Sequence, residues 1–217
     1  MRKTAVMGVI CIVGALLNIA IHKLCTFTGI QLYLDTVFTV AVTLSCGLLW
    51  GAVCGALTNL ICYSVWFWGW EAYLFALCNI ATAFITWGFV WLFPRDLGIV
   101  RKTPNTADEV SFKSTKLSRV MDKVIALMLL AFALCLAMSV MGGVISAAIW
   151  GASPSFPYES SLLIWLGKTM FAENIPTVVR EIVARIPVNM VDRLITAFAG
   201  YGIATLYSLL PTPRSPN

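Results

Sequence analysis

Five long runs without a charged residue limit what this chain can fold into. They cover residues 4–21, 36–70, 72–94, 124–158 and 194–213 of the 217-residue sequence. Each is close to or longer than the ~18 apolar residues that a helix needs to cross a bilayer. Only 12% of the residues are charged, whereas a soluble domain carries about a quarter. The sequence therefore predicts an all-α polytopic membrane protein and excludes a secreted enzyme, a nucleic-acid-binding protein and a disordered chain.

The second run is too long for one membrane helix. Residues 36–70 would form a rod of ~50 Å, whereas the hydrocarbon core of a bilayer is ~30 Å thick. The glycine-containing stretch 45–51 is the natural place for a turn. We therefore expect one membrane domain, 1–217, with a cytoplasmic linker at 94–122, an extracellular segment at 150–187 and six spans. These spans are 4–24, 33–49, 51–69, 72–93, 123–149 and 188–210.

Lysine and arginine are distributed unevenly between the two sides of this domain. With the N-terminus inside, the cytoplasmic side holds Arg2, Lys3, Arg95, Arg101, Lys102, Lys113, Lys116, Arg119, Lys123 and Arg214. The outer side holds Lys23, Lys168, Arg180, Arg185 and Arg193. Because cytoplasmic loops are enriched in Lys and Arg, we expect both termini in the cytoplasm and the protein in the cell (inner or cytoplasmic) membrane.

The extracellular segment contains a short amphipathic stretch. Residues 177–185 place apolar side chains on one helical face and Arg180, Glu181 and Arg185 elsewhere. Such a helix lies on the membrane surface or covers a cavity as a lid. The surface position is the simpler interpretation.

Small residues recur at helical spacing, with Gly47, Gly51 and Gly55 in one series and Cys11 and Ala15 in another. Faces of this kind let helix backbones approach closely. They are either packing surfaces inside the bundle, which is the more frequent case, or a docking face for another membrane subunit.

Polar residues inside spans are costly and are therefore candidates for function. Asp35, Asn79, Asn189 and Asp192 fall in the outer half of the predicted domain. They either line one extracellular-facing pocket or only cap helices and hydrogen-bond between them. We expect Asp35 to contact Arg193. Adjacent residues of a helix point about 100° apart, so we expect Asp192 and Arg193 not to pair.

Aromatic residues are concentrated at 63–73, in the outer turn between the third and fourth spans. Trp and Tyr favour the membrane interface, so an aromatic belt is the simplest interpretation. The alternative is that Trp68 or Trp70 stacks on a flat ligand or closes the mouth of its site.

Catalytic signatures are missing from the sequence. His22 is the only histidine, and neither H-E-x-x-H nor G-x-S-x-G occurs. A P-loop before Gly167-Lys168-Thr169 would need a glycine where Leu162 stands. The seven cysteines contain no C-x-x-C pair and fall mostly within spans, where a cysteine is a small hydrophobe. We expect no enzyme activity, no cofactor and no metal site.

Three stretches together resemble a known family. They are LYLDTVFT at 32–39, GLLWGAVCGALTNL at 47–60 and PVNMVDR at 187–193, the last followed by an apolar helix. These stretches are similar to those of substrate-binding S components of energy-coupling factor (ECF) vitamin transporters, and closest to the riboflavin-type branch. The six-span plan also agrees with that family.

The resemblance implies a subunit that captures a vitamin or related small metabolite outside the cell, with riboflavin as a candidate. It also implies a partnership with a transmembrane T component and two ATPase subunits. The expected ligand-binding residues are Asp35, Trp68, Trp70, Asn79, Asn189 and Asp192, and the expected docking residues are Cys11, Ala15, Gly47, Gly51 and Gly55. The alternatives are a ligand-sensing membrane module and a stand-alone secondary transporter.

Overall fold

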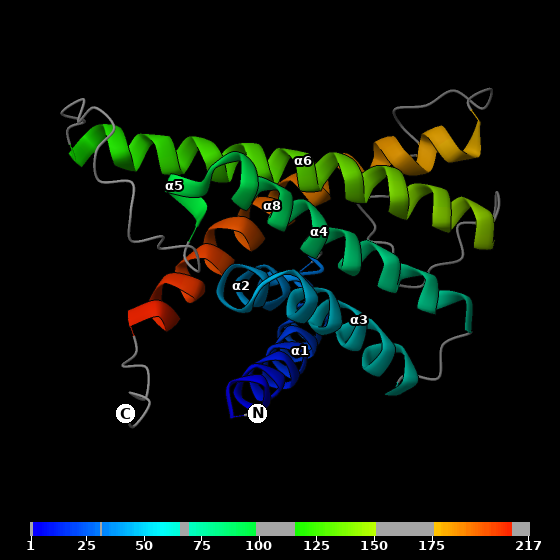
Figure 1. The fold of residues 1–217 in the computed structure, drawn as a ribbon. Coiled ribbons are helices and arrows are strands. Elements are labelled where there is room, and N and C mark those ends of the chain that lie inside the picture. The colour runs from blue at the N-terminus through cyan, green and yellow to red at the C-terminus, as the bar shows by residue number, and fades with distance from the viewer. Residues whose placement is uncertain (1, 31, 66–69, 99–115, 151–175, 210–217) are drawn as a thin grey trace.

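The computed structural model describes residues 2–30, 32–65, 70–98, 116–150 and 176–209. Within these ranges the chain forms helices joined by turns, and no β-strand (Figure 1). The helices are α1 (Arg2–Thr28), α2 (Val37–Cys46), α3 (Leu48–Val65), the 3-10 helix η1 (Trp70–Phe75), α4 (Ala76–Leu92), α5 (Pro94–Leu97), α6 (Lys116–Trp150) and α8 (Thr177–Leu209). The prediction of an all-α fold is confirmed.

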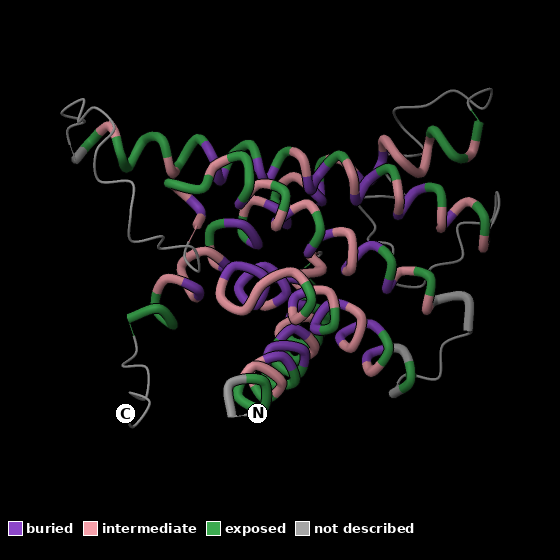
Figure 2. Tube along the Cα trace, in the orientation of Figure 1, coloured by how far each residue is buried: buried purple, intermediate pink, exposed green. Residues whose placement is uncertain are grey.

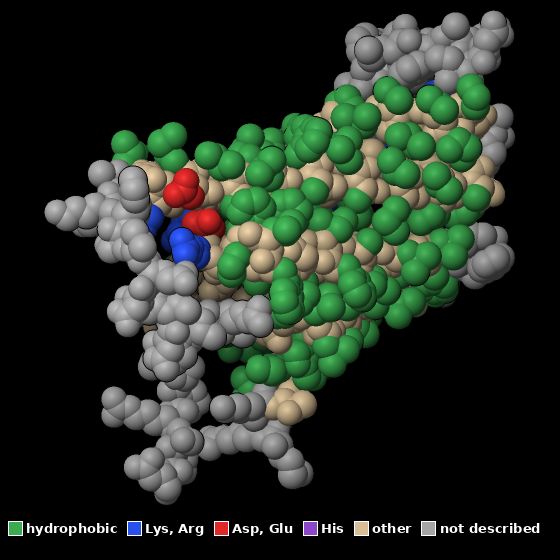
Figure 3. All heavy atoms as spheres, turned by 45° about the horizontal axis from the view of Figure 1, so that its top comes forward, with side chains coloured by type: hydrophobic (Ala, Val, Ile, Leu, Met, Phe, Trp, Pro, Cys, Tyr) green, Lys and Arg blue, Asp and Glu red, His purple; other side chains and the backbone are tan. Residues whose placement is uncertain are grey.

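Within the described residues, three helical stretches are long and apolar enough to cross a bilayer. They are Thr4–Thr28, Tyr73–Leu92 and Leu117–Ile149, while Val37–Cys46 and Leu48–Cys62 are shorter apolar helices. Large apolar side chains are exposed along these helices, and hydrophobic side chains cover much of the face shown in Figure 3. Exposed apolar surface of this extent is typical of contact with lipid. The chain is thus a helical membrane-embedded protein.

The turn in the second apolar run lies where the glycines predict it. α2 ends at Cys46 and α3 begins at Leu48. Gly47, between them, has a φ of 96°, a left-handed conformation that glycine adopts without steric cost. Its N–H donates to the carbonyl of Thr43 at 3.0 Å and so closes the end of α2. The expected break within 45–51 is confirmed.

Several helix boundaries differ from the sequence-based expectation. α6 begins at Lys116, seven residues before the predicted span and within the segment 94–122 that was expected to be a linker. α2 has only 10 residues, about 15 Å of helix or half of the hydrocarbon core, because residues 32–36 are not helical. α8 continues through Pro187 as one helix of 33 residues, although residues 177–185 were expected to form a separate surface helix. Close packing against α6 accompanies this continuity. A Cβ on Gly143 of α6 would lie only 2.8 Å from the backbone nitrogen of Ile182.

The core lies between α2, α4, α6 and α8. α6 packs against both α4 and α8, and α2 contacts α3, α4 and α8. In Figure 1, α4 and α8 run in the opposite direction to α6. Buried residues follow the inner faces of the helices (Figure 2), and the main cluster includes Val40 and Leu44 of α2, Leu130 and Leu134 of α6, and Ala197 of α8. α1 packs on α2 and α3.

Candidate functional site

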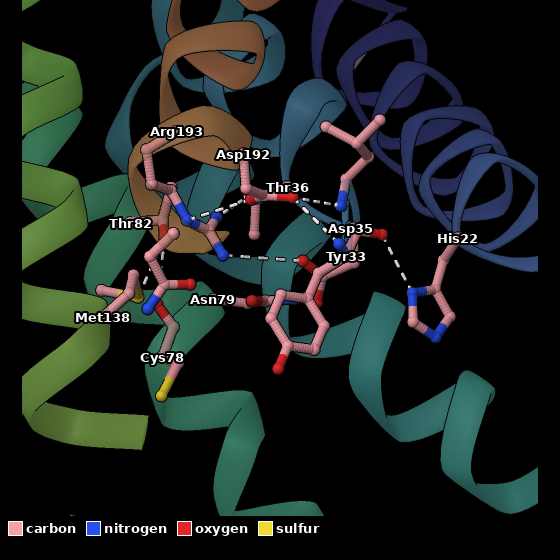
Figure 4. A network of polar contacts seen from close by, with 12 residues as sticks. His22, Tyr33, Asp35, Thr36, Cys78, Asn79, Thr82, Met138, Asp192 and Arg193 are labelled. Atoms are coloured by element: carbon pink, nitrogen blue, oxygen red, sulfur yellow. Dashed lines mark hydrogen bonds and ion pairs between the residues drawn. The ribbon is translucent and has the colours of Figure 1, made fainter. Parts of the chain in front are cut away.

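The centre of the polar network in Figure 4 is Asp192 of α8, which is fully buried. Its Oδ1 accepts the backbone N–H groups of Tyr33 and Leu34 at 2.9 and 2.8 Å. Its Oδ2 lies 3.2 Å from Nε of Arg193. The carboxylate thus fastens the non-helical segment 32–36 to α8, a contact between residues far apart in the sequence.

Arg193 lies beside Asp192 and is only 4% exposed. Its Nη1 donates to the hydroxyl of Thr36, and its Nη2 lies 4.0 Å from Oδ1 of Asp35. The expected contact between Asp35 and Arg193 is therefore confirmed. The expectation that Asp192 and Arg193 do not pair is wrong, because the long arginine side chain folds back over its neighbour and brings Nε within 3.2 Å of Oδ2.

Asp35 connects the network to α4. Its Oδ2 accepts a hydrogen bond from Nδ2 of Asn79 at 3.0 Å. Its Oδ1 is shielded from solvent and has no hydrogen-bond partner among the residues that the structure describes, since 4.0 Å to Arg193 is too long for a hydrogen bond. The Asp35 side chain as a whole is 20% exposed. Among the three charged residues of the network, Asp35 is the most accessible.

Segment 32–36 is also tied to α1. His22 lies with Nδ1 2.9 Å from the carbonyl oxygen of Tyr33. The side chain of Asn18 accepts the N–H of Phe38 at 2.8 Å and donates to the hydroxyls of Thr39 and Thr58 at 3.1 Å each. These contacts join α1, α2 and α3 next to the charged residues.

Leu34 adopts a backbone conformation that is unusual for its type. Its φ is +44°, in the left-handed region that costs an L-residue roughly 1–2 kcal/mol. The N–H of Leu34 is one of the two donors to Asp192. We infer that the hydrogen bond to Asp192 helps to hold this strained residue in place.

Asn189 lies one turn before Arg193 on α8 but joins a different contact. Its Nδ2 donates to the hydroxyl of Ser139 on α6 at 2.9 Å. Nearer the start of α8, Glu181 accepts from Arg185 at 3.2 Å and from Ser146 of α6 at 3.3 Å. Asn189 therefore belongs to a polar seam between α6 and α8, next to the charged network.

Four of the five small residues expected at a docking face lie inside the bundle, and the fifth, Gly47, lies partly buried in the turn between α2 and α3. Cys11 and Ala15 are buried against Val42 and Cys54. A Cβ on Gly51 would lie 2.8 Å from Cβ of Thr43, and one on Gly55 would lie 2.7 Å from the carbonyl oxygen of Asn79. These four residues pack against neighbouring helices of the same chain, which is the internal-packing alternative considered for them. Docking of another subunit through them stays a prediction.

The expected aromatic residues are only partly placed. Trp68 lies outside the described residues, and Trp70 begins η1, with its side chain outside the description. Tyr73 of η1 lies with its hydroxyl 3.0 Å from that of Ser64 at the end of α3. A stacking role for Trp68 or Trp70 stays a prediction.

The structure thus brings together Asp35, Asn79 and Asp192 of the expected ligand-binding residues. It adds Thr36 and also Arg193, which was expected as a contact of Asp35; neither was among the expected ligand-binding residues. The cost of placing an arginine in an apolar helix would have justified including Arg193 among them. In the described ranges, no three His, Cys, Asp or Glu side chains lie together in a position to hold a metal ion.

Comparison of the chain with protein-family models, with curated proteins and with solved structures gave no match. The chemical capacity of the network must therefore be judged from its own residues. It combines two carboxylates, one guanidinium and one amide within apolar helices. Such a group can exchange hydrogen bonds with a polar molecule, and its charges act strongly because little water screens them.

Proposed function

We propose that the chain is the substrate-capture (S) subunit of an ECF-type ATP-driven importer that takes up a vitamin or related small metabolite. The observation that carries this proposal is the network of Asp35, Asn79, Asp192 and Arg193, which is embedded among apolar helices. Charged side chains are expensive in a membrane, and in membrane proteins they mark substrate and ion pathways.

The position of the network supports a capture function. Asn79 lies in the first turn of α4, and Asp35 and Thr36 immediately precede α2. In the proposed topology of six spans with cytoplasmic termini, these helix starts face the outside. Asp35, whose side chain is 20% exposed, is then the residue of the network most accessible to a ligand that approaches from the extracellular side.

The proposal also rests on the sequence motifs that resemble S components. Two of the three motif stretches, 32–39 and 187–193, contain Asp35, Asp192 and Arg193 of the network, whereas Asn79 lies outside them. In an ECF importer the energy for uptake comes from ATPase subunits that act through a T component. The sequence has no P-loop, which agrees with ATP hydrolysis taking place on separate subunits. The proposed location of the protein is the cell membrane.

The deciding experiment is identification of the bound molecule. The full chain is purified in detergent from cells grown in rich medium and denatured, and released compounds are identified by mass spectrometry and absorbance. We expect one small metabolite at near-stoichiometric amounts; a yellow flavin would identify riboflavin. Preparations that repeatedly contain no compound, and bind none of a set of vitamins, would contradict the proposal.

Energy coupling is tested separately in cells with the identified compound. We expect uptake to stop when ATP is depleted while the ion gradients are maintained. Uptake that continues without ATP and stops when the ion gradients collapse would instead show a secondary transporter. Binding without any uptake, even with T and ATPase subunits co-expressed, would instead indicate a sensing module.

A further inference from the structure

The charges of the network do not balance. Asp35 and Asp192 each carry a carboxylate, whereas Arg193 supplies one guanidinium. With both carboxylates ionised, two negative charges and one positive charge leave a formal charge of −1 within the network. The neighbouring pair on α8, Glu181 and Arg185, is neutral as a unit and adds nothing to this sum.

The two carboxylates share Arg193 unequally. Asp192 has Nε of Arg193 at 3.2 Å and also accepts two backbone N–H groups. Asp35 has Nη2 of Arg193 only at 4.0 Å and accepts one neutral amide hydrogen bond from Asn79. The guanidinium therefore compensates mainly Asp192, and the excess negative charge belongs to Asp35.

An excess charge in this environment requires compensation. A carboxylate that leaves water without a partner loses several kcal/mol of hydration, and a hydrogen-bonded counter-charge is the usual remedy. Oδ1 of Asp35 is shielded and lacks a hydrogen-bond partner in the described part of the chain. A ligand nitrogen that is positively charged and carries a hydrogen atom would supply both the missing charge and the missing donor.

We propose that the network selects a ligand that presents a cationic, hydrogen-bearing nitrogen to Oδ1 of Asp35. This inference rests on the proposed function, because it describes the ligand class of the same site. Asn79 orients the Asp35 carboxylate from the other oxygen, and Arg193 holds Asp192 and Thr36 in place behind it. A ligand that presents a carboxylate at this position would meet Asp35 as a like charge and would be rejected.

The test uses the full-length protein in detergent. It compares the affinity for ligands of different charge and the affinities of two matched variants. The charge of the co-purified compound is determined after its release. Binding of pyridoxamine (which carries a cationic ammonium group), riboflavin (neutral) and pantothenate (anionic) is measured by tryptophan fluorescence and calorimetry. Asp35→Asn preserves the shape of the side chain and removes its charge, while Asp122→Asn makes the same change at an exposed position of α6.

We expect the co-purified compound to carry a cationic, hydrogen-bearing nitrogen and pyridoxamine to bind more tightly than pantothenate. Loss of a charge-assisted hydrogen bond should weaken binding of the cationic compound by about 10- to 100-fold in Asp35→Asn, with no change in Asp122→Asn. The comparison of the three probes needs no variant and stands even where Asp35→Asn does not fold.

Three results would overturn the inference, and they show whether the capture function falls with it. A tightly bound neutral or anionic compound, or equal affinity of Asp35→Asn and the wild type for the bound compound, refutes the charge preference and leaves the capture function standing. Failure of the wild type to hold or bind any of these compounds refutes both proposals.

Discussion

Replacement of Gly51 by alanine tests whether the small-residue series of α3 packs inside the bundle. A Cβ at this position would lie 1.9 Å from Oγ1 and 2.9 Å from Cα of Thr43 in α2. The hydroxyl can rotate away, but the Cα atom cannot move without shifting α2. We therefore expect Gly51→Ala to push α2 and α3 apart and to destabilise the isolated protein.

Gly88→Ala on α4 is the matched control. It adds the same methyl group within a helix, and nothing in the described structure lies within 4 Å of the new Cβ. Both substitutions gain about 1 kcal/mol of helix propensity, so the difference between them isolates the steric effect. Overpacking of a tight contact costs about 1–3 kcal/mol, and each kcal/mol shifts the Tm of a chain of this size by about 2–4 °C.

Thermal unfolding of the two variants in detergent, followed by circular dichroism at 222 nm, measures this difference. We expect Gly51→Ala to unfold several degrees below Gly88→Ala, and Gly88→Ala to match or slightly exceed the wild type. Equal Tm values for the two variants would refute the internal packing of Gly51. If Gly51 instead faced a partner, the isolated protein would tolerate the methyl group, and only assembly with the partner would be weakened.

Two further predictions concern the buried charge and the topology. Asp192→Ala leaves Arg193 buried without its nearest counter-charge and releases the N–H groups of Tyr33 and Leu34. We therefore expect the protein to lose about 3–5 kcal/mol of stability, which is measured from its Tm and from the yield of monodisperse protein. A variant as stable as the wild type would show that Asp192 does not hold segment 32–36. The topology is tested in intact cells with a membrane-impermeant maleimide. This reagent should label Ser64→Cys, which is exposed at the end of α3. It should label Asp122→Cys, near the start of α6, only after the membrane has been permeabilised. Labelling of both variants from outside would contradict the proposed six-span topology.

Several features of the fold could be predicted because they depend on local physics. An apolar run without charges favours a helix in a membrane, and α1, α4 and α6 follow such runs. Gly47 could be expected at a turn because glycine alone adopts a φ of 96° without steric cost. The contact between Asp35 and Arg193 could be expected because opposite charges in an apolar bundle must find each other.

Other features depend on contacts between distant residues and could not be read locally. Val37 begins α2 four residues later than the predicted span, because Leu34 has a φ of +44°, which a right-handed helix does not allow, and Asp192 binds the N–H groups of Tyr33 and Leu34 in this conformation. α8 continues through Pro187 while the preceding turns pack closely on Gly143 of α6. Neither partner is apparent from the sequence around these positions.

The sequence by itself determined three features: the helical membrane class of the protein, the position of the turn between α2 and α3, and the identity of the polar residues within its apolar segments. Composition and backbone sterics suffice for those features, because each acts within a few residues. Only the tertiary structure decided that Asp192 pairs with Arg193 and holds segment 32–36, and that Asp35 has a shielded oxygen without a hydrogen-bond partner in the described residues. These features depend on where α8 lies relative to residues more than 150 positions earlier in the chain, and long-range packing alone sets that position.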